Sequence, residues 1–225
     1  VGSIPTLAGY MLPAIIRTFR DTFPGIRVHF TDDATNKLER MVLDRELDFY
    51  IGPQPSATSG LTFQAVAKDQ YVVVLPKSHP MTKARSVSIS DVVKEPLLLF
   101  RREMMVRKEV DAFFAKNQIA VQPVEEVSNH YTLGGLVEAE FGITLLPSSA
   151  TGLAAHPGLT TVKLSEKDFF RILGIATRSD YRPTPAAKAF LKLITPLVRQ
   201  HTQNFSHRSN TTQSKRNYVA STKRQ

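Results

Sequence analysis

The sequence predicts an α/β protein built from two β-α series, and three observations lead to that prediction. Short apolar stretches alternate with segments of helical period, this alternation occurs twice along the chain, and the last helical segment has no strand after it. Such alternation is typical of a parallel sheet with helices on its faces. A chain that crosses from one sheet to a second and then returns forms two lobes joined by two hinge strands.

The first β-α series is expected within residues 1–71. A helical apolar period runs over residues 11–23, where the dipeptide Pro-Gly ends it. Thr35 is placed to cap the next helix. Strands are predicted around these helices in the stretches VGSI, IRVHFT and LDFYIG, and the following PQPSATSG has the composition of a loop.

Two separate strands, LTFQAVA and QYVVVLP, lead into the second series, and His79-Pro80 ends the second of them. Further strands are predicted in PLLLF, GITLLP, LTTVKL and FRILGIAT, and VQPVEEV is expected at an edge because Pro123 cannot donate to a ladder. Helices are predicted over residues 106–117 and around 133–137. Thr184-Pro185 starts a final helix that packs back on the first series, since threonine caps and proline fits the first helical position.

Charge and composition exclude several classes of protein. The formal net charge is +9, but residues 201–225 carry five basic and no acidic side chains, so we expect a disordered basic tail there rather than a nucleic-acid arm. The absence of cysteine excludes disulfides and thiolate metal sites. Apolar runs are too short to cross a bilayer and no signal peptide opens the chain, so a cytoplasmic location without membrane contact is expected.

Five stretches, in family order over residues 1–198, resemble the effector-binding domain of LysR-type transcriptional regulators. GSIPTLAGYMLPAIIRTFRDTFPGIRVHF resembles its start, and LDRELDFYIG resembles its G-E-L-D-x-x-I stretch. YVVVLPKSHPM, LVEAEFGITLLP and TPAAKAFLKLI resemble its P-x-x-H-P-L, V-x-x-G-x-G-I-x-L-L-P and S-P-A-A-x-x-F motifs. Arg45 and Glu140 stand where the family usually has glycine. The turn before Glu46 therefore uses a residue less suited to φ > 0, and the helix end near Phe141 is expected to differ.

The resemblance implies two Rossmann-like subdomains of the type 2 periplasmic-binding-protein-like fold, joined by two hinge strands. Subdomain I is expected to comprise residues 1–71 with 176–200, and subdomain II residues 72–175. The resemblance also implies a small-molecule effector in the cleft and a homodimer or higher homo-oligomer. DNA would be bound only through the family's N-terminal winged helix-turn-helix, which this sequence lacks. No cofactor and no metal are expected.

Side chains at strand tips are the candidates for binding the effector. The helix after Ser3 and Thr6 begins with unpaired N–H groups and a partial positive charge, so a carboxylate or other small anion fits there. Helix capping is the alternative role for these hydroxyls, for Thr35 and for the Asn129 segment, and Arg101 either pairs with a carboxylate or is a solvated arginine. The predicted ligand-binding residues are Ser3, Ile4, Thr6, Thr35, Phe100, Arg101, Asn129, His130 and Thr144, with Phe141 a weaker candidate.

Two other classes of function have the same architecture. A solute-binding protein of a transporter is the alternative, and it would carry a signal peptide or lipobox upstream where a regulator carries a helix-turn-helix. An enzyme is not expected, because the sequence holds neither a nucleophile elbow nor a Walker loop. The six histidines show no metal-ligand spacing, and the neighbours in Asp32-Asp33 and Glu125-Glu126 point to opposite faces of a strand, so neither pair can share a proton.

Overall fold

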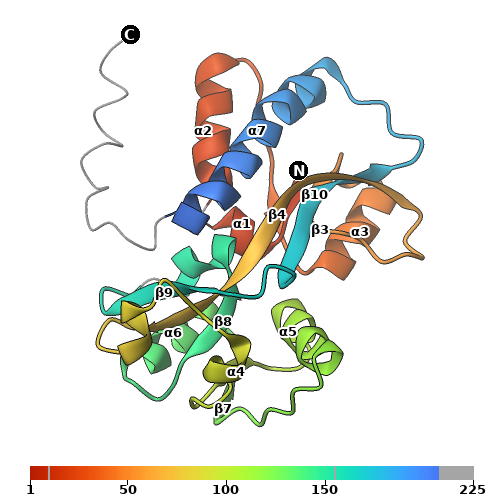
Figure 1. Ribbon diagram of the computed structural model, residues 1–225. Coiled ribbons are helices and arrows are strands. Elements are labelled where there is room, and N and C mark those ends of the chain that lie inside the picture. The colour runs from red at the N-terminus through yellow and green to blue at the C-terminus, as the bar shows by residue number, and fades with distance from the viewer. Residues whose placement is uncertain (10, 155, 208–225) are drawn as a thin grey trace.

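Strands and helices alternate along the chain in a computed structural model that describes residues 1–9, 11–154 and 156–207 (Figure 1). The strands are β1 (Gly2–Ser3), β2 (Thr31–Asp32), β3 (Tyr50–Pro53), β4 (Leu61–Pro76), β5 (Ser86–Val87), β6 (Leu98–Phe100), β7 (Glu125–Val127), β8 (Thr144–Pro147), β9 (Leu159–Leu164) and β10 (Phe170–Arg178). The α-helices are α1 (Pro5–Ala8), α2 (Leu12–Thr22), α3 (Thr35–Leu43), α4 (Ile89–Val92), α5 (Met105–Lys116), α6 (His130–Glu138) and α7 (Pro185–His207). The 3-10 helices are η1 (Pro80–Lys83) and η2 (Ser148–Ala154).

The sheet topology confirms a parallel first series. β1 pairs in parallel with both β2 and β3. The strand order is β2-β1-β3-β10-β4-β9-β5, with β8 also paired to β4, and the parallel pair β6-β7 lies apart from this path. β7 is an edge strand as expected, and Pro123 precedes its first paired residue, where a missing N–H does no harm.

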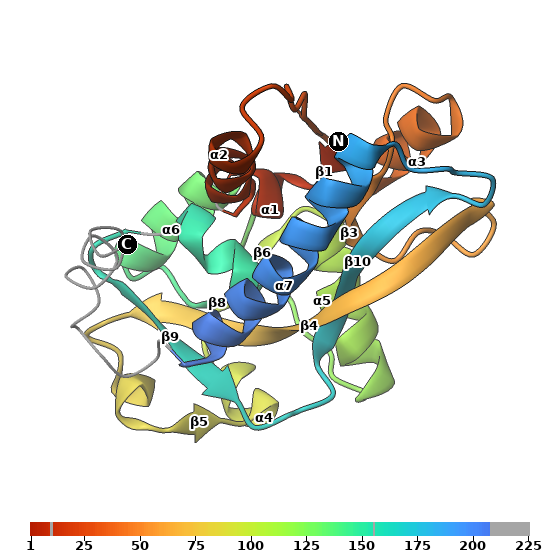
Figure 2. The same cartoon turned by 90° about the horizontal axis from the view of Figure 1, so that it is seen from above.

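Residues 61–76 form one strand rather than the two that the sequence predicts. β4 pairs with β10 along residues 61–70 and with β8 and β9 along residues 71–76. The polar segment between the two apolar runs does not break the strand, because its backbone pairs with β10 and Asp69 finds a buried partner there. Figure 1 shows β4 and β10 running from one half of the molecule into the other, as hinge strands do, and Figure 2 shows the two strands side by side.

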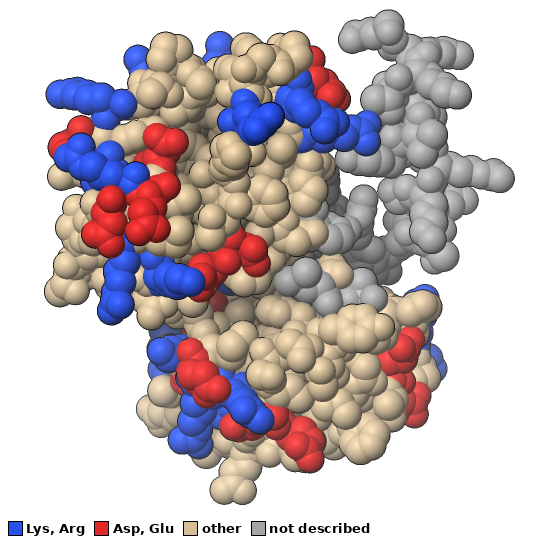
Figure 3. Space-filling view, turned by 180° about the vertical axis from the view of Figure 1, so that it is seen from behind, with Lys and Arg blue, Asp and Glu red and all other residues tan. Residues whose placement is uncertain are grey.

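Each half of the molecule has its own hydrophobic core. The first core takes its buried residues from 4–66 and 173–198, and the second from 71–169. α7 supplies Phe190, Ile194 and Val198 to the first core, so the last helix does pack back on the first series. The space-filling view shows a constriction between the two halves, with charges of both signs scattered over that face (Figure 3). The subdomain boundaries at residues 71/72 and 175/176 remain predictions.

Local signals place the main helices. α2 buries Leu12, Ile15 and Phe19 on one face, and α7 begins at Pro185 with the Thr184 hydroxyl accepting a hydrogen bond from the Ala187 N–H at 3.2 Å. The turns at Arg45 and Glu140 have φ of 65° and 62°. The backbone of both residues therefore has the left-handed conformation, at positions where the family usually has glycine.

Several predicted boundaries are wrong, since VQPVEEV is a strand only from Glu125 and GITLLP only from Thr144, and two larger differences lie near the ends of the fold. Of the stretch IRVHFT only its last residue, Thr31, belongs to a strand, because β1 offers β2 just two residues with which to pair. At the other end α7 continues to His207, so the first seven residues of the expected disordered tail are helical. Residues 208–225 of that tail lie outside the described residues.

Candidate functional site

A cavity of about 510 Å³ is lined by residues of both halves of the molecule. Four helix N-termini meet at it, contributed by the residue ranges 4–6 (α1), 34–36 (α3), 104–106 (α5) and 128–130 (α6). Pro53, Glu103, Lys108 and Arg171 complete the lining. The volume falls within the range of roughly 300–1,000 Å³ that is usual for small-molecule sites.

Three of these four helices have no side-chain cap. Ile4, Ala34 and Met104 hold the N-cap positions of α1, α3 and α5 without bonding the helix through a side chain. Asn129 does cap α6, accepting from the Thr132 N–H at 2.8 Å. First-turn amides have no partner within an α-helix and carry roughly half a positive charge in sum. The longer helices α3 and α5 therefore bring free donors and positive potential to the wall of the cavity.

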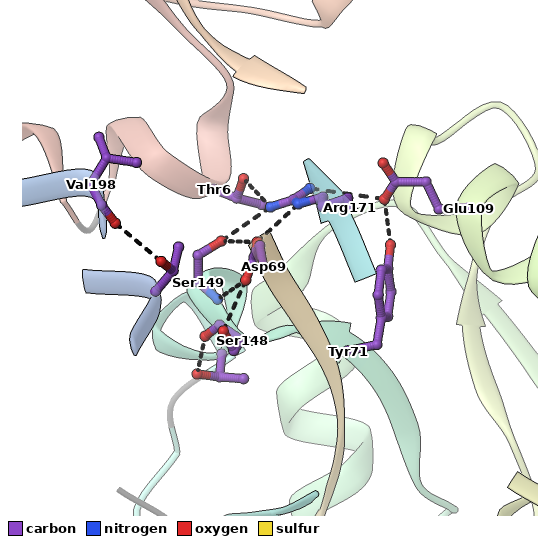
Figure 4. A network of polar contacts seen from close by, with 10 residues as sticks. Thr6, Asp69, Tyr71, Glu109, Ser148, Ser149, Arg171 and Val198 are labelled. Atoms are coloured by element: carbon purple, nitrogen blue, oxygen red, sulfur yellow. Dashed lines mark hydrogen bonds and ion pairs between the residues drawn. The ribbon is translucent and has the colours of Figure 1, made fainter. Parts of the chain in front are cut away.

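Arg171 is the buried cation of the site, with a residue exposure of 6%. It belongs to β10 and lies where that strand crosses between the two cores. Its Nε donates to Oδ2 of Asp69 at 2.9 Å, and its Nη2 donates to Oγ of Ser149 at 3.1 Å and to Oγ1 of Thr6 at 3.3 Å (Figure 4). The guanidinium thus joins α1 of one half to η2 of the other.

Asp69 holds Arg171 in place with a fully buried carboxylate. Its Oδ1 accepts hydrogen bonds from the Ser148 hydroxyl at 2.8 Å and from the Ser149 N–H at 3.0 Å. Its Oδ2 accepts from the Ser149 hydroxyl at 2.6 Å as well as from Arg171. A buried ion pair survives desolvation only when its remaining lone pairs are satisfied in this way.

The Nη1 group of Arg171 makes no hydrogen bond to any described residue. Oε2 of Glu109, on α5, lies 4.0 Å from it, beyond hydrogen-bonding distance. That Glu109 oxygen instead accepts a hydrogen bond from the Tyr71 hydroxyl (Figure 4). Burial raises the pKa of Glu109 above its ordinary value, against the lowering effects of Arg171 and of the Tyr71 hydrogen bond. Arg171 lines the cavity, and its Nη1 is engaged only by this 4.0 Å ion pair with Glu109 among the described residues.

His130 is an uncharged residue of the cavity lining. Its ring packs against Phe100 with 4.6 Å between ring centroids, and its Nε2 is buried without a partner among the described residues. Burial, together with the charge of Arg171, lowers the pKa of His130 to about 4. The ring is therefore uncharged at neutral pH, with one nitrogen that donates a hydrogen bond and one that accepts.

The structure brings five of the nine predicted ligand-binding residues to the cavity. Those that line it are Ile4, Thr6, Thr35, Asn129 and His130. The prediction that Thr35 caps α3 is wrong, because Ala34 holds the N-cap position. Thr6 is likewise no cap: it follows Pro5 inside α1, and its oxygen accepts from Arg171.

The other four predicted residues lie outside the cavity lining, and they are Ser3, Phe100, Arg101 and Thr144. Ser3 is fully buried and its hydroxyl donates to the Ile51 carbonyl at 3.2 Å. Phe100 lies behind His130, and Arg101 is exposed. Thr144 is buried and its hydroxyl has no hydrogen-bond partner among the described residues, while the weaker candidate Phe141 is 60% exposed.

Arg171 and Asp69 belong to the candidate site but were not among the residues predicted from the sequence. The signal available was a charged residue inside each of two apolar strands, FRILGIAT and the joined stretch of residues 61–76. Buried charges are almost always paired, so a charged residue inside an apolar strand is expected to have a partner of opposite charge. Lys108 and Glu103 at the cavity rim gave no signal, because they stand in an ordinary charged segment.

None of the helices within the described ranges has the length and apolar character needed to cross a membrane. The same part of the chain contains no cluster of three or more histidine or acidic side chains arranged to hold a metal ion.

Known proteins resemble this chain in sequence. It is 30% identical over 191 residues to the uncharacterized HTH-type transcriptional regulator YbhD of Escherichia coli K12, covering 85% of this chain and 60% of YbhD. It is 27% identical over 155 residues to the HTH-type transcriptional regulator AlsR of Bacillus subtilis, covering 68% of this chain and 51% of AlsR. The chain thus spans between half and two thirds of these relatives.

Solved structures share the fold. A Corynebacterium glutamicum OxyR C206 mutant superposes with a TM-score of 0.80 at 24% identity, covering 93% of this chain and 67% of that one. The BenM effector-binding domain with its effector benzoate gives 0.77 at 20% identity, covering 93% and 92%. The effector-binding domain of QuiR in complex with shikimate gives 0.71 at 22% identity, covering 87% and 93%. These likenesses confirm the predicted type 2 periplasmic-binding-protein-like fold.

The family assignment rests on the match over nearly the whole folded chain. The sequence model of the LysR substrate binding domain matches residues 1–198, which reach from β1 into α7. Proteins of this family are transcriptional regulators and not enzymes. This chain therefore belongs to the LysR substrate-binding-domain family.

Proposed function

We propose that the chain is the effector-binding part of a LysR-type transcriptional regulator and that its effector is a small organic anion, most simply a carboxylate, held in the cavity between the two halves. One observation carries the proposal: the N-termini of α1, α3, α5 and α6 meet at a cavity that is also lined by the buried Arg171. Free amide donors and a guanidinium together suit a carboxylate better than a cation or an apolar molecule.

The energetics support an anion. A negative charge near a helix N-terminus gains about 0.3–1 kcal/mol, and up to about 2 kcal/mol in partly buried geometry. Hydrogen bonds between a guanidinium and a carboxylate are roughly twice as strong as neutral ones. Glu103 at the rim opposes these gains, but Lys108 stands in the same lining and offsets its charge.

Two structural neighbours illustrate the class of ligand. The BenM domain was solved with benzoate as its effector, and the QuiR domain was solved in complex with shikimate. Both compounds are carboxylates. Neither is assigned to this chain, since identities of 20–22% support the fold alone.

Effector binding would act by changing the relation between the two halves. A ligand shifts a conformational equilibrium only by its different affinity for the two arrangements. When the two halves are closed, the ligand is contacted by α1 and α3 on one side and by α5 and α6 on the other. The closed arrangement therefore makes more contacts with the ligand than an open one. We propose that this change passes through a homodimer or higher oligomer to a winged helix-turn-helix outside this sequence, in the cytoplasm where the DNA lies.

The transporter alternative gains no specific support. The curated relatives named above are transcriptional regulators, whereas a solute-binding protein would share only the two-lobed architecture. The upstream coding sequence distinguishes the two, since a helix-turn-helix favours regulation and a signal peptide favours transport.

A thermal-shift screen of small acids paired with their uncharged counterparts tests the proposal. Benzoate is compared with benzamide, and shikimate with its methyl ester, alongside a panel of short mono- and dicarboxylates. A ligand present at 100 times its Kd stabilises the folded state by about 2.7 kcal/mol, and each kcal/mol moves the Tm of a chain this size by roughly 2–4 °C.

Variants then locate the site. Thr6→Val removes the hydroxyl at the cavity with little change of volume, and Thr18→Val, on the exposed face of α2, is the matched control. We expect Thr6→Val to weaken the best acid and Thr18→Val to leave it unchanged. If the uncharged counterparts bind as well as the acids, or if Thr6→Val has no effect on a bound acid, the proposed anion site is wrong.

A further inference from the structure

We propose that Glu109 competes with the effector anion for Arg171, so that an anion enters the cavity together with a proton that Glu109 takes up from solvent. This inference rests on the anion-binding function proposed above, and it adds the proton dependence and the residue responsible for it. Its basis is that two carboxylates share one guanidinium that lines the cavity, and that the second of them, Glu109, makes no hydrogen bond to it.

The carboxylates of Asp69 and Glu109 differ in how closely they are bound to Arg171. Asp69 is bound to Nε of Arg171 at 2.9 Å and satisfied by three further hydrogen bonds, so it stays with the guanidinium whatever the cavity contains. Glu109 approaches only to 4.0 Å of Nη1 and makes no hydrogen bond to it. Its oxygen is engaged by the Tyr71 hydroxyl instead. Glu109 is therefore the charge that can change without breaking the buried ion pair.

The charge balance decides what happens when an anion arrives. Arg171 carries one positive charge, and ionised Asp69 already neutralises it. An ionised Glu109 makes the cluster negative overall, and an effector carboxylate on Nη1 would add a further negative charge within a few ångströms. Like charges at that separation disfavour joint ionisation, so Glu109 binds a proton when the anion binds. In the protonated form Glu109 still pairs with the Tyr71 oxygen.

Other charged groups around the cluster do not replace Glu109 in this role. Burial raises the pKa of Tyr71 well above its ordinary value, so this phenol stays neutral. Burial lowers the pKa of His130, from α6, to about 4, so this ring is neutral across the pH range of the test. Glu103 and Lys108 line the cavity but are exposed, so water screens them. Thr6 and Ser149, from α1 and η2, are uncharged partners of Arg171.

Chloride is the probe, because any anion that reaches Nη1 reports the competition whatever the natural effector is. The excess ³⁵Cl NMR line width that the protein induces is measured between pH 5.5 and 8.5 for wild type, Glu109→Gln and Glu103→Gln. Glutamine keeps an oxygen to accept from Tyr71 and removes the charge. Glu103→Gln removes an exposed carboxylate of the same cavity lining that forms no ion pair with Arg171. Chloride binding to surface cations cancels between the variants.

We expect wild-type chloride affinity to fall as pH rises, approaching about tenfold per pH unit once Glu109 is ionised in the free protein. Glu109→Gln should bind as wild type does at low pH, with a flat profile, and Glu103→Gln should keep the wild-type slope. The inference is overturned if chloride affinity in wild type depends on pH no more steeply than in Glu109→Gln. It is also overturned if Glu103→Gln removes the pH dependence of chloride affinity.

A carboxylate arm separates this inference from the proposed function. The best acid of the thermal-shift screen is titrated into wild type and Glu109→Gln at pH 5.5 and 8.5. If an acid binds with the same pH profile in both proteins, the effector site stands and the role of Glu109 is wrong. If no acid binds while chloride shows the Glu109-dependent slope, the anion competition stands and the organic-acid effector is wrong.

Discussion

Replacing Asp69 by asparagine should be among the most destabilising isosteric changes in this protein. The side chain is fully buried and ends in two oxygens that each receive one fixed N–H donor: Oδ1 that of Ser149, and Oδ2 the Nε–H of Arg171. An asparagine amide has one oxygen and one NH₂ group. Whichever way it turns, one of these N–H groups faces another donor, and Arg171 loses its bound counter-charge.

The expected cost follows from that geometry. Breaking a buried ion pair by removing one partner's charge costs about 3–5 kcal/mol, because an uncompensated charge stays buried. The Glu109 carboxylate, 4.0 Å from Nη1 of Arg171, compensates only part of the lost interaction. A domain of this kind has a free energy of unfolding of about 5–15 kcal/mol. Asp69→Asn therefore removes a large share of the free energy that stabilises the folded state.

Urea unfolding followed by far-UV circular dichroism measures the change, with the m value held as a check that the same surface unfolds. Asp168→Asn is the control, since Asp168 pairs with Lys116 on the surface and should show no measurable effect. The double variant Asp69→Leu/Arg171→Met should be more stable than Asp69→Asn, because it removes both charges. A loss below about 1 kcal/mol for Asp69→Asn would refute the reasoning.

Three further outcomes are expected. The pKa of His130 lies below its ordinary value of 6.5, so the stability that this residue contributes is complete above pH 6.5 and is lost as pH falls toward 4. Between pH 7.5 and pH 4, the free energy of unfolding should therefore fall by about 3 kcal/mol less in His130→Phe than in wild type. An equal fall in both proteins would contradict this. Thr184→Ala removes the cap of α7 and should cost about 1 kcal/mol in urea unfolding, whereas an unchanged midpoint would mean that the 3.2 Å hydrogen bond contributes nothing. Gly174→Ala would place a Cβ 2.3 Å from a backbone oxygen of β4 at the bulge between the hinge strands and should lower stability by at least about 2 kcal/mol. Gly25→Ala, with no atom within 4 Å, is its control, and equal stability of the two variants would rule the clash out.

Much of the candidate site follows from helix starts that the sequence predicts. Thr6, Thr35 and His130 are predictable because each stands near the beginning of an apolar helical period, and such beginnings meet at the cavity. Their detailed roles are not predictable, because capping depends on the φ and ψ angles of one residue. A shift of one position makes Ala34 rather than Thr35 the N-cap.

Arg101 and Arg171 show where prediction from sequence fails. Arg101 ends an apolar strand and is suited by type to a carboxylate, yet it lies exposed and outside the cavity lining. Arg171 sits inside an apolar strand with no neighbouring motif, yet it is the buried cation of the site. Strand register and the path of the hinge decide which of the two faces the cavity, and neither is encoded locally.

The order of strands and helices, the two β-α series and the return of the last helix were determined by the sequence alone, because apolar periodicity and capping are properties of neighbouring residues. The continuous β4, the two-residue β2 and the Asp69–Arg171 pair were decided only in the tertiary structure. The two residues of that pair are 102 positions apart. Their contact exists because the register of β10 on β4 places Arg171 opposite Asp69, and a buried charge takes whatever partner that register supplies.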